Sequence, residues 1–250
     1  VLLALFLLIG YTINIVAQVD RNLRFTHLTN DNGLPTNTIY SLCQDFKGFI
    51  WIATANGLCK YDGRSISVYE VEPTKGERKK GGIIRHVFED KRHRLWVITH
   101  KGVNLYNRNK DNFNFVSVDS LNNFSRVIYQ DDKGKIYMGG SGAFIYNEQT
   151  SKFDPFYVNQ DETITAFITA ITSDQKGQMW FGRMYGGLIC ADVENGKLTR
   201  YKHNDHNINS LISNKVTSLF TDHHGRIWIG TEDKGICYFD SSTNKFIRIE

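Results

Sequence analysis

The chain has 250 residues, 41% of them hydrophobic and 22% charged, an ordinary globular composition with enough apolar material for a sizeable core. Its 30 basic and 26 acidic residues leave a formal net charge of +4, too small an excess to call for nucleic acid or anionic lipid as a partner. An aromatic share of 13%, with 21 Gly and only 3 Pro, favours an all-β protein with many turns.

Residues 1–18 have the pattern of a secretory signal peptide. An apolar run reaches from Val1 to Ala17, and the small residue before Gln18 offers a cleavage site. The alternatives are a membrane helix, although the run is interrupted by Asn14 and falls short of about 20 apolar residues, and a buried first strand. Neither Met nor a basic leader precedes the run, so we expect the N-terminus to be incomplete.

After the leader, residues 24–28 alternate between polar and apolar side chains as a short strand would. A dense turn signal follows at Asn30–Pro35. The apolar segment Ile39–Cys43 then leads into a unit that begins at Asp45 and is repeated through the rest of the chain.

The repeat is marked by one aromatic position. It is occupied by Trp51, Trp96, Tyr137, Trp180 and Trp228, at spacings of 45, 41, 43 and 48 residues. A period in the forties with about four short strands per period is the signature of a β-propeller blade. Within a propeller region of residues 19–250, the predicted blades span residues 39–70, 83–118, 124–157, 166–201 and 216–249.

Each repeat has a physical logic that the first one illustrates. Asp45 and Gly48 are predicted to form a hairpin turn, in which the carboxylate accepts backbone N–H bonds and glycine allows a positive φ. The following strand is apolar on both faces around Trp51, as expected of a strand sandwiched between two sheets. The recurrent aspartates and tryptophans are therefore interpreted as capping and core residues, although carboxylate pairs and rim aromatics that stack on sugars are their functional alternatives.

Four cysteines, Cys43, Cys59, Cys190 and Cys237, show no CxxC spacing. Export would allow them to pair, but Cys59, Cys190 and Cys237 lie in the third strands of different repeats. We therefore expect small apolar core residues and not a disulfide framework.

The opening of the chain resembles the two-component regulator propeller family. The resemblance is carried by Phe25–Leu28, Asp31–Pro35, Gly48–Thr54 and Tyr61–Gly63, and by the linker Asn209–Val216 before the last repeat. It covers about residues 24–250. Five repeats in register behind this opening signature are far more specific than a lone Gly-x-x-Trp.

The resemblance implies the periplasmic sensor region of a hybrid two-component system of Bacteroidetes. Such a region senses an oligosaccharide or another small ligand and signals to a membrane-anchored histidine kinase that regulates transcription. The implied partners are that ligand and a second copy of the receptor, in a homodimer formed through the parent protein. The membrane would be reached only through a missing C-terminal part, and no nucleic acid would be bound by this segment.

Relatives of this kind look like seven-bladed propellers, which need roughly 300 residues. We therefore expect an all-β, incomplete seven-bladed propeller with five four-stranded blades. Residues 24–28 would be its closing strand, with a partner in an absent blade. The alternative is a closed five-bladed ring, which tight contact between the first and fifth blades would favour.

No catalytic, cofactor or metal residue is assigned, because the sequence contains no Gly-x-Ser-x-Gly, His-Glu-x-x-His or phosphate-binding glycine loop. A metal at His203 and His206 or at His223 and His224 is an alternative to exposed loop histidines. A polyanion site in the basic loop Glu77–Gly82 is likewise an alternative to a solvated loop.

The ligand site itself is not identified by the sequence. Loops between strands are where a ligand is expected, and the candidates are Thr74–Gly82, Asn159–Thr163 and His203–Asn209. The competing functions are a secreted propeller enzyme, either a lyase or a glycosidase, and a protein-interaction scaffold. For this segment a non-enzymatic sensor is favoured, since no distinctive polar cluster marks one blade mouth.

Overall fold

The computed structural model describes residues 25–71, 82–99, 101–118, 124–158, 164 and 166–249. The predicted signal peptide at residues 1–18 lies outside these residues. So do nearly all of the loops Thr74–Gly82 and Asn159–Thr163. No helix in the described part of the chain is long and apolar enough to cross a lipid bilayer.

Five four-stranded antiparallel sheets follow one another along the chain, each built from four consecutive strands paired in sequence order. The first three are β1 (Ile39–Gln44), β2 (Ile50–Thr54), β3 (Gly57–Tyr61) and β4 (Ile66–Tyr69); β5 (Ile84–Glu89), β6 (Leu95–Thr99), β7 (Gly102–Asn107) and β8 (Asn112–Val116); and β9 (Ser125–Gln130), β10 (Ile136–Gly140), β11 (Ala143–Asn147) and β12 (Lys152–Pro155). The last two are β13 (Ile168–Ser173), β14 (Met179–Arg183), β15 (Gly187–Asp192) and β16 (Lys197–Tyr201); and β17 (Val216–Thr221), β18 (Ile227–Thr231), β19 (Ile236–Asp240) and β20 (Lys245–Arg248). The predicted all-β class with five four-stranded blades is confirmed.

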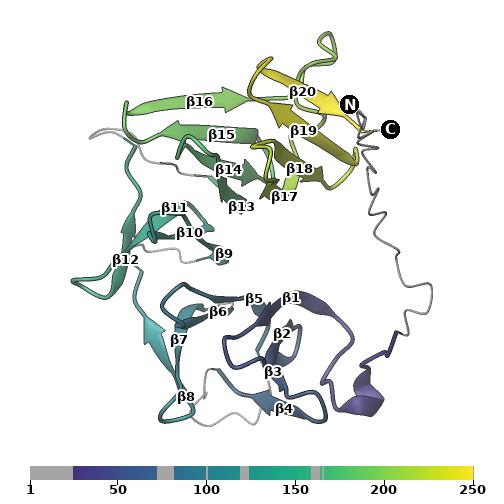
Figure 1. Cartoon of the computed structure of the whole chain (residues 1–250), viewed down its shortest axis with the longest axis vertical. Coiled ribbons are helices and arrows are strands. Elements are labelled where there is room, and N and C mark those ends of the chain that lie inside the picture. The colour runs from purple at the N-terminus through teal and green to yellow at the C-terminus, as the bar shows by residue number, and fades with distance from the viewer. Residues whose placement is uncertain are drawn as a thin grey trace, which may run out of the picture.

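The sheets are arranged radially in an open arc, with the first strand of each sheet on the inner side (Figure 1). Successive inner strands lie side by side, β1 against β5, β5 against β9, β9 against β13 and β13 against β17. Among the described residues, β17 makes no comparable contact with β1. The structure is therefore an open arc and not the closed five-bladed ring that was the alternative.

Aromatic side chains fill the spaces between neighbouring sheets. Trp51, fully buried, packs against Tyr106 of the next sheet with ring centroids 5.0 Å apart. Trp180 packs in the same way against Phe239, also at 5.0 Å. Trp51, Trp96 and Trp180 thus face the following sheet, and this explains why the strands that carry them are apolar on both faces.

The interface between the third and fourth sheets is built differently. Tyr137 stands where the other repeats have tryptophan, and Ala191 stands where the following sheet would supply an aromatic ring. Phe156 fills the remaining space, 5.5 Å from Tyr137 and 5.7 Å from Phe181. The two departures in the sequence therefore belong to one repacked interface.

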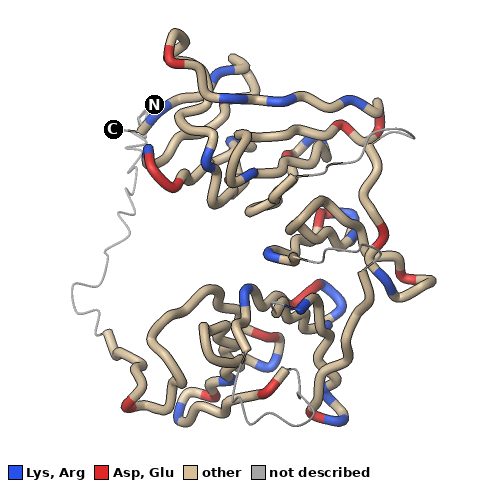
Figure 2. Tube along the Cα trace, turned by 180° about the vertical axis from the view of Figure 1, so that it is seen from behind, with Lys and Arg blue, Asp and Glu red and all other residues tan. Residues whose placement is uncertain are grey.

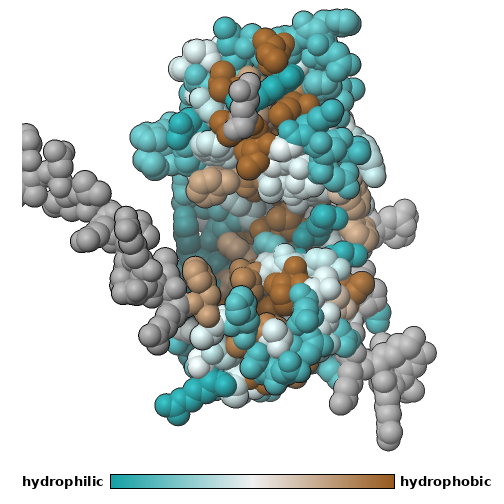
Figure 3. Space-filling model, turned by 90° about the vertical axis from the view of Figure 1, so that its right-hand side faces the viewer, coloured by the Kyte–Doolittle hydropathy of each residue, from teal (hydrophilic) through white to brown (hydrophobic). Residues whose placement is uncertain are grey.

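The fifth sheet has no further sheet on its outer face within the described chain. As a result Trp228 is only partly buried, unlike Trp51, Trp96 and Trp180, and Phe220 is 64% exposed. The prediction that all four tryptophans are core residues is therefore wrong for Trp228. Figure 3 views the open side of the arc and shows hydrophobic side chains on both end sheets, with a hollow between them.

The N-terminal segment covers the outer face of the first sheet. A short 3₁₀ helix, η1 (Asn30–Asn32), ends at Gly33, whose φ of 101° completes the predicted turn. Leu34 is buried against Ile52 and Cys59, with Leu28 packed beside them. Residues 25–28 belong to no strand of the described chain, so a ring-closing role for residues 24–28 stays a prediction.

Candidate functional site

The Asp hairpins lie on one face of the arc and are structural. The Asp45 carboxylate accepts N–H bonds from Lys47 and Phe49, each at 3.0 Å, and a third from the Trp51 indole at 3.0 Å. The same bond joins Trp96 to Asp90 (2.9 Å), Trp180 to Asp174 (3.1 Å) and Trp228 to Asp222 (2.8 Å), and the Tyr137 hydroxyl replaces it toward Asp131 (3.2 Å). The capping role predicted for these aspartates is confirmed, and their carboxylates stabilise the hairpin turns.

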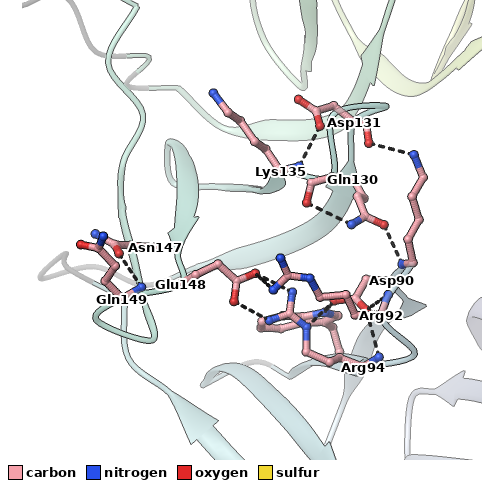
Figure 4. A network of polar contacts seen from close by, with 12 residues as sticks. Asp90, Arg92, Arg94, Gln130, Asp131, Lys135, Asn147, Glu148 and Gln149 are labelled. Carbon is pink, nitrogen blue, oxygen red and sulfur yellow. Dashed lines mark hydrogen bonds and ion pairs between the residues drawn. The ribbon is translucent and has the colours of Figure 1, made fainter.

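The face of the arc that carries the five Asp hairpins, here called the Asp face, is also rich in ion pairs between sheets. Arg108 of the second sheet contacts Asp45 at 2.9 Å and Glu89 at 2.7 Å. Figure 4 shows the next interface, where Arg92 and Arg94 point toward Glu148 of the third sheet, at 3.1 and 2.8 Å. The charges of this face are therefore used to join one sheet to the next.

The histidines considered as metal ligands do not form a metal site. Both ring nitrogens of His203 are engaged, Nδ1 with the Leu211 carbonyl at 2.7 Å and Nε2 with Asp205 at 2.8 Å. The rings of His223 and His224 lie 3.8 Å apart and are tilted by 44° to each other, in the exposed hairpin of the fifth sheet. In the described residues, no group of three or more His, Cys, Asp or Glu side chains could hold an ion.

The four cysteines are free thiols, and Cys59, Cys190 and Cys237 are buried. Burial raises the pKa of Cys59 to about 11 and that of Cys190 to about 12. These thiols are protonated and inert at neutral pH, which confirms their interpretation as small core residues.

The loop His203–Asn209 is the one sequence-predicted loop that the structure describes throughout. It leaves β16, the outermost strand of the fourth sheet, and is fixed by local hydrogen bonds such as that from the Asn204 amide to the Ser210 hydroxyl at 3.0 Å. It therefore starts at the outer edge of the arc, away from the inner strands.

A cavity of about 450 Å³ lies on the inner side of the arc and is lined by the first strands of all five sheets. We call it the channel cavity. Its volume lies in the range of small-ligand sites, and its wall mixes aromatic, basic and hydroxyl side chains. The residues of this wall that bear polar groups or rings are Tyr40, Arg85, His86, Phe88, Arg126, Tyr129, Thr169, Thr217 and Ser218.

One position of the repeat defines the rim of the channel cavity. The second residue of each inner strand is skipped in the pairing with the neighbouring strand and so forms a bulge. These five bulge residues are Tyr40, Arg85, Arg126, Thr169 and Thr217. Bulges of this kind redirect side chains, and they are frequent beside functional sites.

The bulge residues of the fourth and fifth sheets are satisfied by their own surroundings. Thr169 donates to a carbonyl of β14 or of Val216, and Thr217 donates to the Gly230 carbonyl at 3.2 Å. Burial lowers the pKa of His86, so its imidazole is neutral at pH 7, and its Nδ1 accepts the Ile128 amide at 3.5 Å. The groups that the cavity offers for binding are therefore the Ser218 hydroxyl, the Tyr40 phenol and the guanidinium groups of Arg85 and Arg126.

Sequence reasoning did not single out Arg85 and Arg126. The signal was present, since both lie five residues before the hairpin aspartate, at the position occupied elsewhere by Tyr40, Thr169 and Thr217. The sequence could not show that this position forms a bulge at the inner rim, because the bulge is visible only once the strands are paired.

Two segments of the chain, residues 33–56 and 210–233, match the family model described as two-component regulator propeller. Among curated proteins, "Histidine kinase P4" of Formosa agariphila is 34% identical over 82 residues, which are 31% of this chain and 6% of that protein. The chain therefore spans a small part of this relative.

Solved structures show the same fold. The extracellular domain of a putative hybrid two-component system from B. thetaiotaomicron is 24% identical, with a TM-score of 0.74 over 88% of this chain and 31% of its own. Virginiamycin B lyase from Staphylococcus aureus is 15% identical, with a TM-score of 0.62 over 85% of this chain and 70% of its own. Two stretches of this chain, in its first and fifth repeats, thus match the two-component regulator propeller model, and its five radial sheets share the fold of these solved structures.

Proposed function

We propose that this chain is part of the sensor domain of a hybrid two-component system, which binds an oligosaccharide or a similar small ligand and signals to a membrane-anchored histidine kinase. The observation that carries the proposal is the channel cavity, because every one of the five sheets contributes to its wall. A ligand bound there would contact all the sheets at once and so could change how they sit relative to one another.

The matched regulator repeats and the fold shared with an extracellular two-component domain support this function. An exported location and a homodimer formed through the parent receptor belong to the same proposal. The chemistry of the wall suits a sugar, since Tyr40 is 45% exposed and threonine, serine and tyrosine hydroxyls lie nearby.

The test is a binding screen of the purified chain against an oligosaccharide panel by isothermal titration calorimetry. For a ligand that binds, Tyr40→Ala should weaken the affinity about tenfold, because a ring at the rim is lost. Tyr157→Ala is the matched control, since Tyr157 is 55% exposed and follows the outermost strand of the third sheet. Equal effects of the two substitutions would contradict binding in the channel cavity.

A lyase is among the proteins that share the fold, so turnover must be measured beside binding. The same oligosaccharides are incubated with the chain and analysed by chromatography. Unchanged oligosaccharides agree with a sensor. Product formation would contradict the sensor and favour the alternative of a secreted lyase or glycosidase.

A further inference from the structure

Arg85 and Arg126 are the two basic residues at the rim of the channel cavity, and no carboxylate among the described residues pairs with either of them. The Arg85 Nε is buried and has no hydrogen-bond partner among the described residues. A buried donor without a partner is costly, so such groups call for an explanation.

The arginines of the Asp face provide the contrast. Arg94 contacts Asp90 at 2.6 Å, Arg108 contacts Asp45 at 2.9 Å, and Arg226 contacts Asp222 at 2.7 Å. The fold therefore neutralises these guanidinium groups, within a hairpin or between two sheets, whereas the two at the channel rim have no acidic partner among the described residues. Charged residues lie all around the trace in Figure 2, with basic residues also on the inner side of the arc.

Aromatic rings hold the two guanidinium groups in place. Arg85 lies 5.3 Å from the Tyr40 ring and 5.8 Å from the Phe124 ring, and Arg126 lies 5.8 Å from the Phe167 ring. Phe124 and Phe167 are themselves 5.2 Å apart, so the five side chains form one continuous row. Cation–π contacts of this kind orient a guanidinium group, and they leave its terminal N–H donors available to a ligand.

The two positive charges also act on each other. Burial, and then repulsion from Arg85, lower the pKa of Arg126. Two like charges that influence each other, with no acidic partner among the described residues, weaken the folded state, and the binding of an anion beside them removes this penalty.

We propose that the Arg85–Arg126 pair binds an anionic group, a carboxylate or a sulfate, carried by the oligosaccharide that the channel cavity takes. Two planar forks suit the paired oxygens of such groups, and the neighbouring rings suit the apolar face of a sugar. The proposal rests on the sensor function proposed above, and it adds that the ligand is acidic.

The experiment compares three forms of one sugar backbone on an array that covers several linkages. Each tetrasaccharide is printed as the neutral form, as the form with C6 oxidised to a carboxylate, and as the form with C6 sulfated. The chain is applied as wild type, Arg85→Gln, Arg126→Gln and the control Arg64→Gln. Arg64 is exposed in the β3–β4 turn, and its replacement makes the same change in net charge.

The expected result is binding of carboxylated or sulfated forms that weakens about tenfold or more in Arg85→Gln and in Arg126→Gln, and stays unchanged in Arg64→Gln. The array tells the two anions apart. Binding of neutral forms with equal affinity in all four proteins would overturn the acidic ligand and leave the sensor function standing.

If no oligosaccharide binds, the sensor proposal fails, and the anion site is tested alone. The thermal midpoint is measured in sodium sulfate and in sodium chloride at equal ionic strength. Sulfate raises the midpoint of any protein to some extent, so the quantity of interest is the difference between variants. A larger rise for wild type than for Arg85→Gln and Arg126→Gln supports the site, and equal rises overturn it.

Discussion

At the scale of the residue, one hydrogen bond explains the spacing that marks every repeat. The hairpin aspartate and the aromatic residue six positions later are joined through the carboxylate and the indole N–H, or a tyrosine hydroxyl in the third repeat. Asp45 and Trp51 are both buried, so neither group has water as an alternative partner. The pair therefore links a turn to the packing between two sheets.

Replacing Trp96 by Phe should lower the free energy of unfolding by about 3 kcal/mol. The substitution removes a hydrogen bond to the buried Asp90 carboxylate, worth about 1.5–3 kcal/mol, and leaves a small cavity. Trp228→Phe removes the same kind of bond from a partly exposed site and should cost about 1.5 kcal/mol. Urea unfolding followed by circular dichroism measures both, and equal losses would show that burial does not matter.

The Asp45 carboxylate makes stability depend on pH. Burial alone would raise its pKa, but hydrogen bonds from Trp51 and Arg108 outweigh that effect, and the pKa lies below its ordinary value of 3.8. Because the folded protein holds the proton more weakly than the unfolded chain, the stabilisation is complete above about pH 4 and is lost as the pH falls further.

Asp45→Asn should therefore cost about 2 kcal/mol at pH 7 and less at pH 3, because at pH 3 the unfolded wild-type chain binds a proton at Asp45 more readily than the folded protein does. Urea unfolding at both values measures the gap between the two proteins. Asp132→Asn is the control, since the Asp132 side chain is 97% exposed and should give no gap at either pH. An equal loss of unfolding free energy in Asp45→Asn at pH 3 and at pH 7 would contradict the lowered pKa of Asp45.

At the scale of the element, each inner strand has two parts with different roles. The part after the bulge leads to the hairpin aspartate, and the bulge residue lies at the rim of the channel cavity. Beyond the bulge, the inner strand carries on to the hairpin aspartate, which is the same in every repeat. The bulge residue differs from repeat to repeat, as tyrosine, arginine, arginine, threonine and threonine. The fold thus keeps the hairpin fixed while it allows the rim of the channel cavity to vary.

Gly140 shows how a departure from the repeat is enforced by its neighbours. Three of the other repeats have threonine at this place, for example Thr54, whose hydroxyl bonds the Gly57 carbonyl at 2.8 Å. At Gly140 a Cβ atom would lie 1.7 Å from the Phe124 carbonyl oxygen. Restoring a side chain there is therefore harmful, although the repeat pattern favours it.

Gly140→Ala should destabilise the chain by about 3 kcal/mol or more, because the backbone of residue 124 must move. Gly63→Ala is a matched control, since a Cβ there meets nothing within 4 Å and only its φ of 93° causes strain, about 1 kcal/mol. Thermal unfolding compares the two. A smaller loss for Gly140→Ala than for Gly63→Ala would show that the close approach is easily relieved.

At the scale of the whole molecule, stability is distributed over interfaces between successive sheets. Four hydrophobic clusters lie between neighbouring sheets, and a fifth lies between the first sheet and the N-terminal segment. In such a stacked array each sheet contacts only its neighbours, so a substitution at one interface should destabilise that interface more than the others.

The ion pairs test this expectation. Arg108→Ala removes the ion-pair partner of the buried carboxylates Asp45 and Glu89 and should cost about 3 kcal/mol. Lys133→Ala removes an exposed pair with Glu194 and should cost less than about 0.5 kcal/mol. Hydrogen exchange followed by mass spectrometry should show faster exchange in the first two sheets of Arg108→Ala, with β17–β20 unchanged. A uniform increase along the chain would contradict independent interfaces.

The sequence by itself determined the repeat, the strand order and the sheet count. The period, the turn residues and the spacing from aspartate to aromatic residue all lie within about 45 residues. They reflect interactions inside one repeat and can therefore be recognised in the sequence. The same locality explains why Trp228 was misjudged, because its burial depends on a neighbouring sheet and not on its own repeat. Only the tertiary structure decided that the arc is open and that Tyr40, Arg85 and Arg126 meet at one rim. Those residues lie some 40 residues apart along the chain, and only the radial stacking of the sheets brings them together.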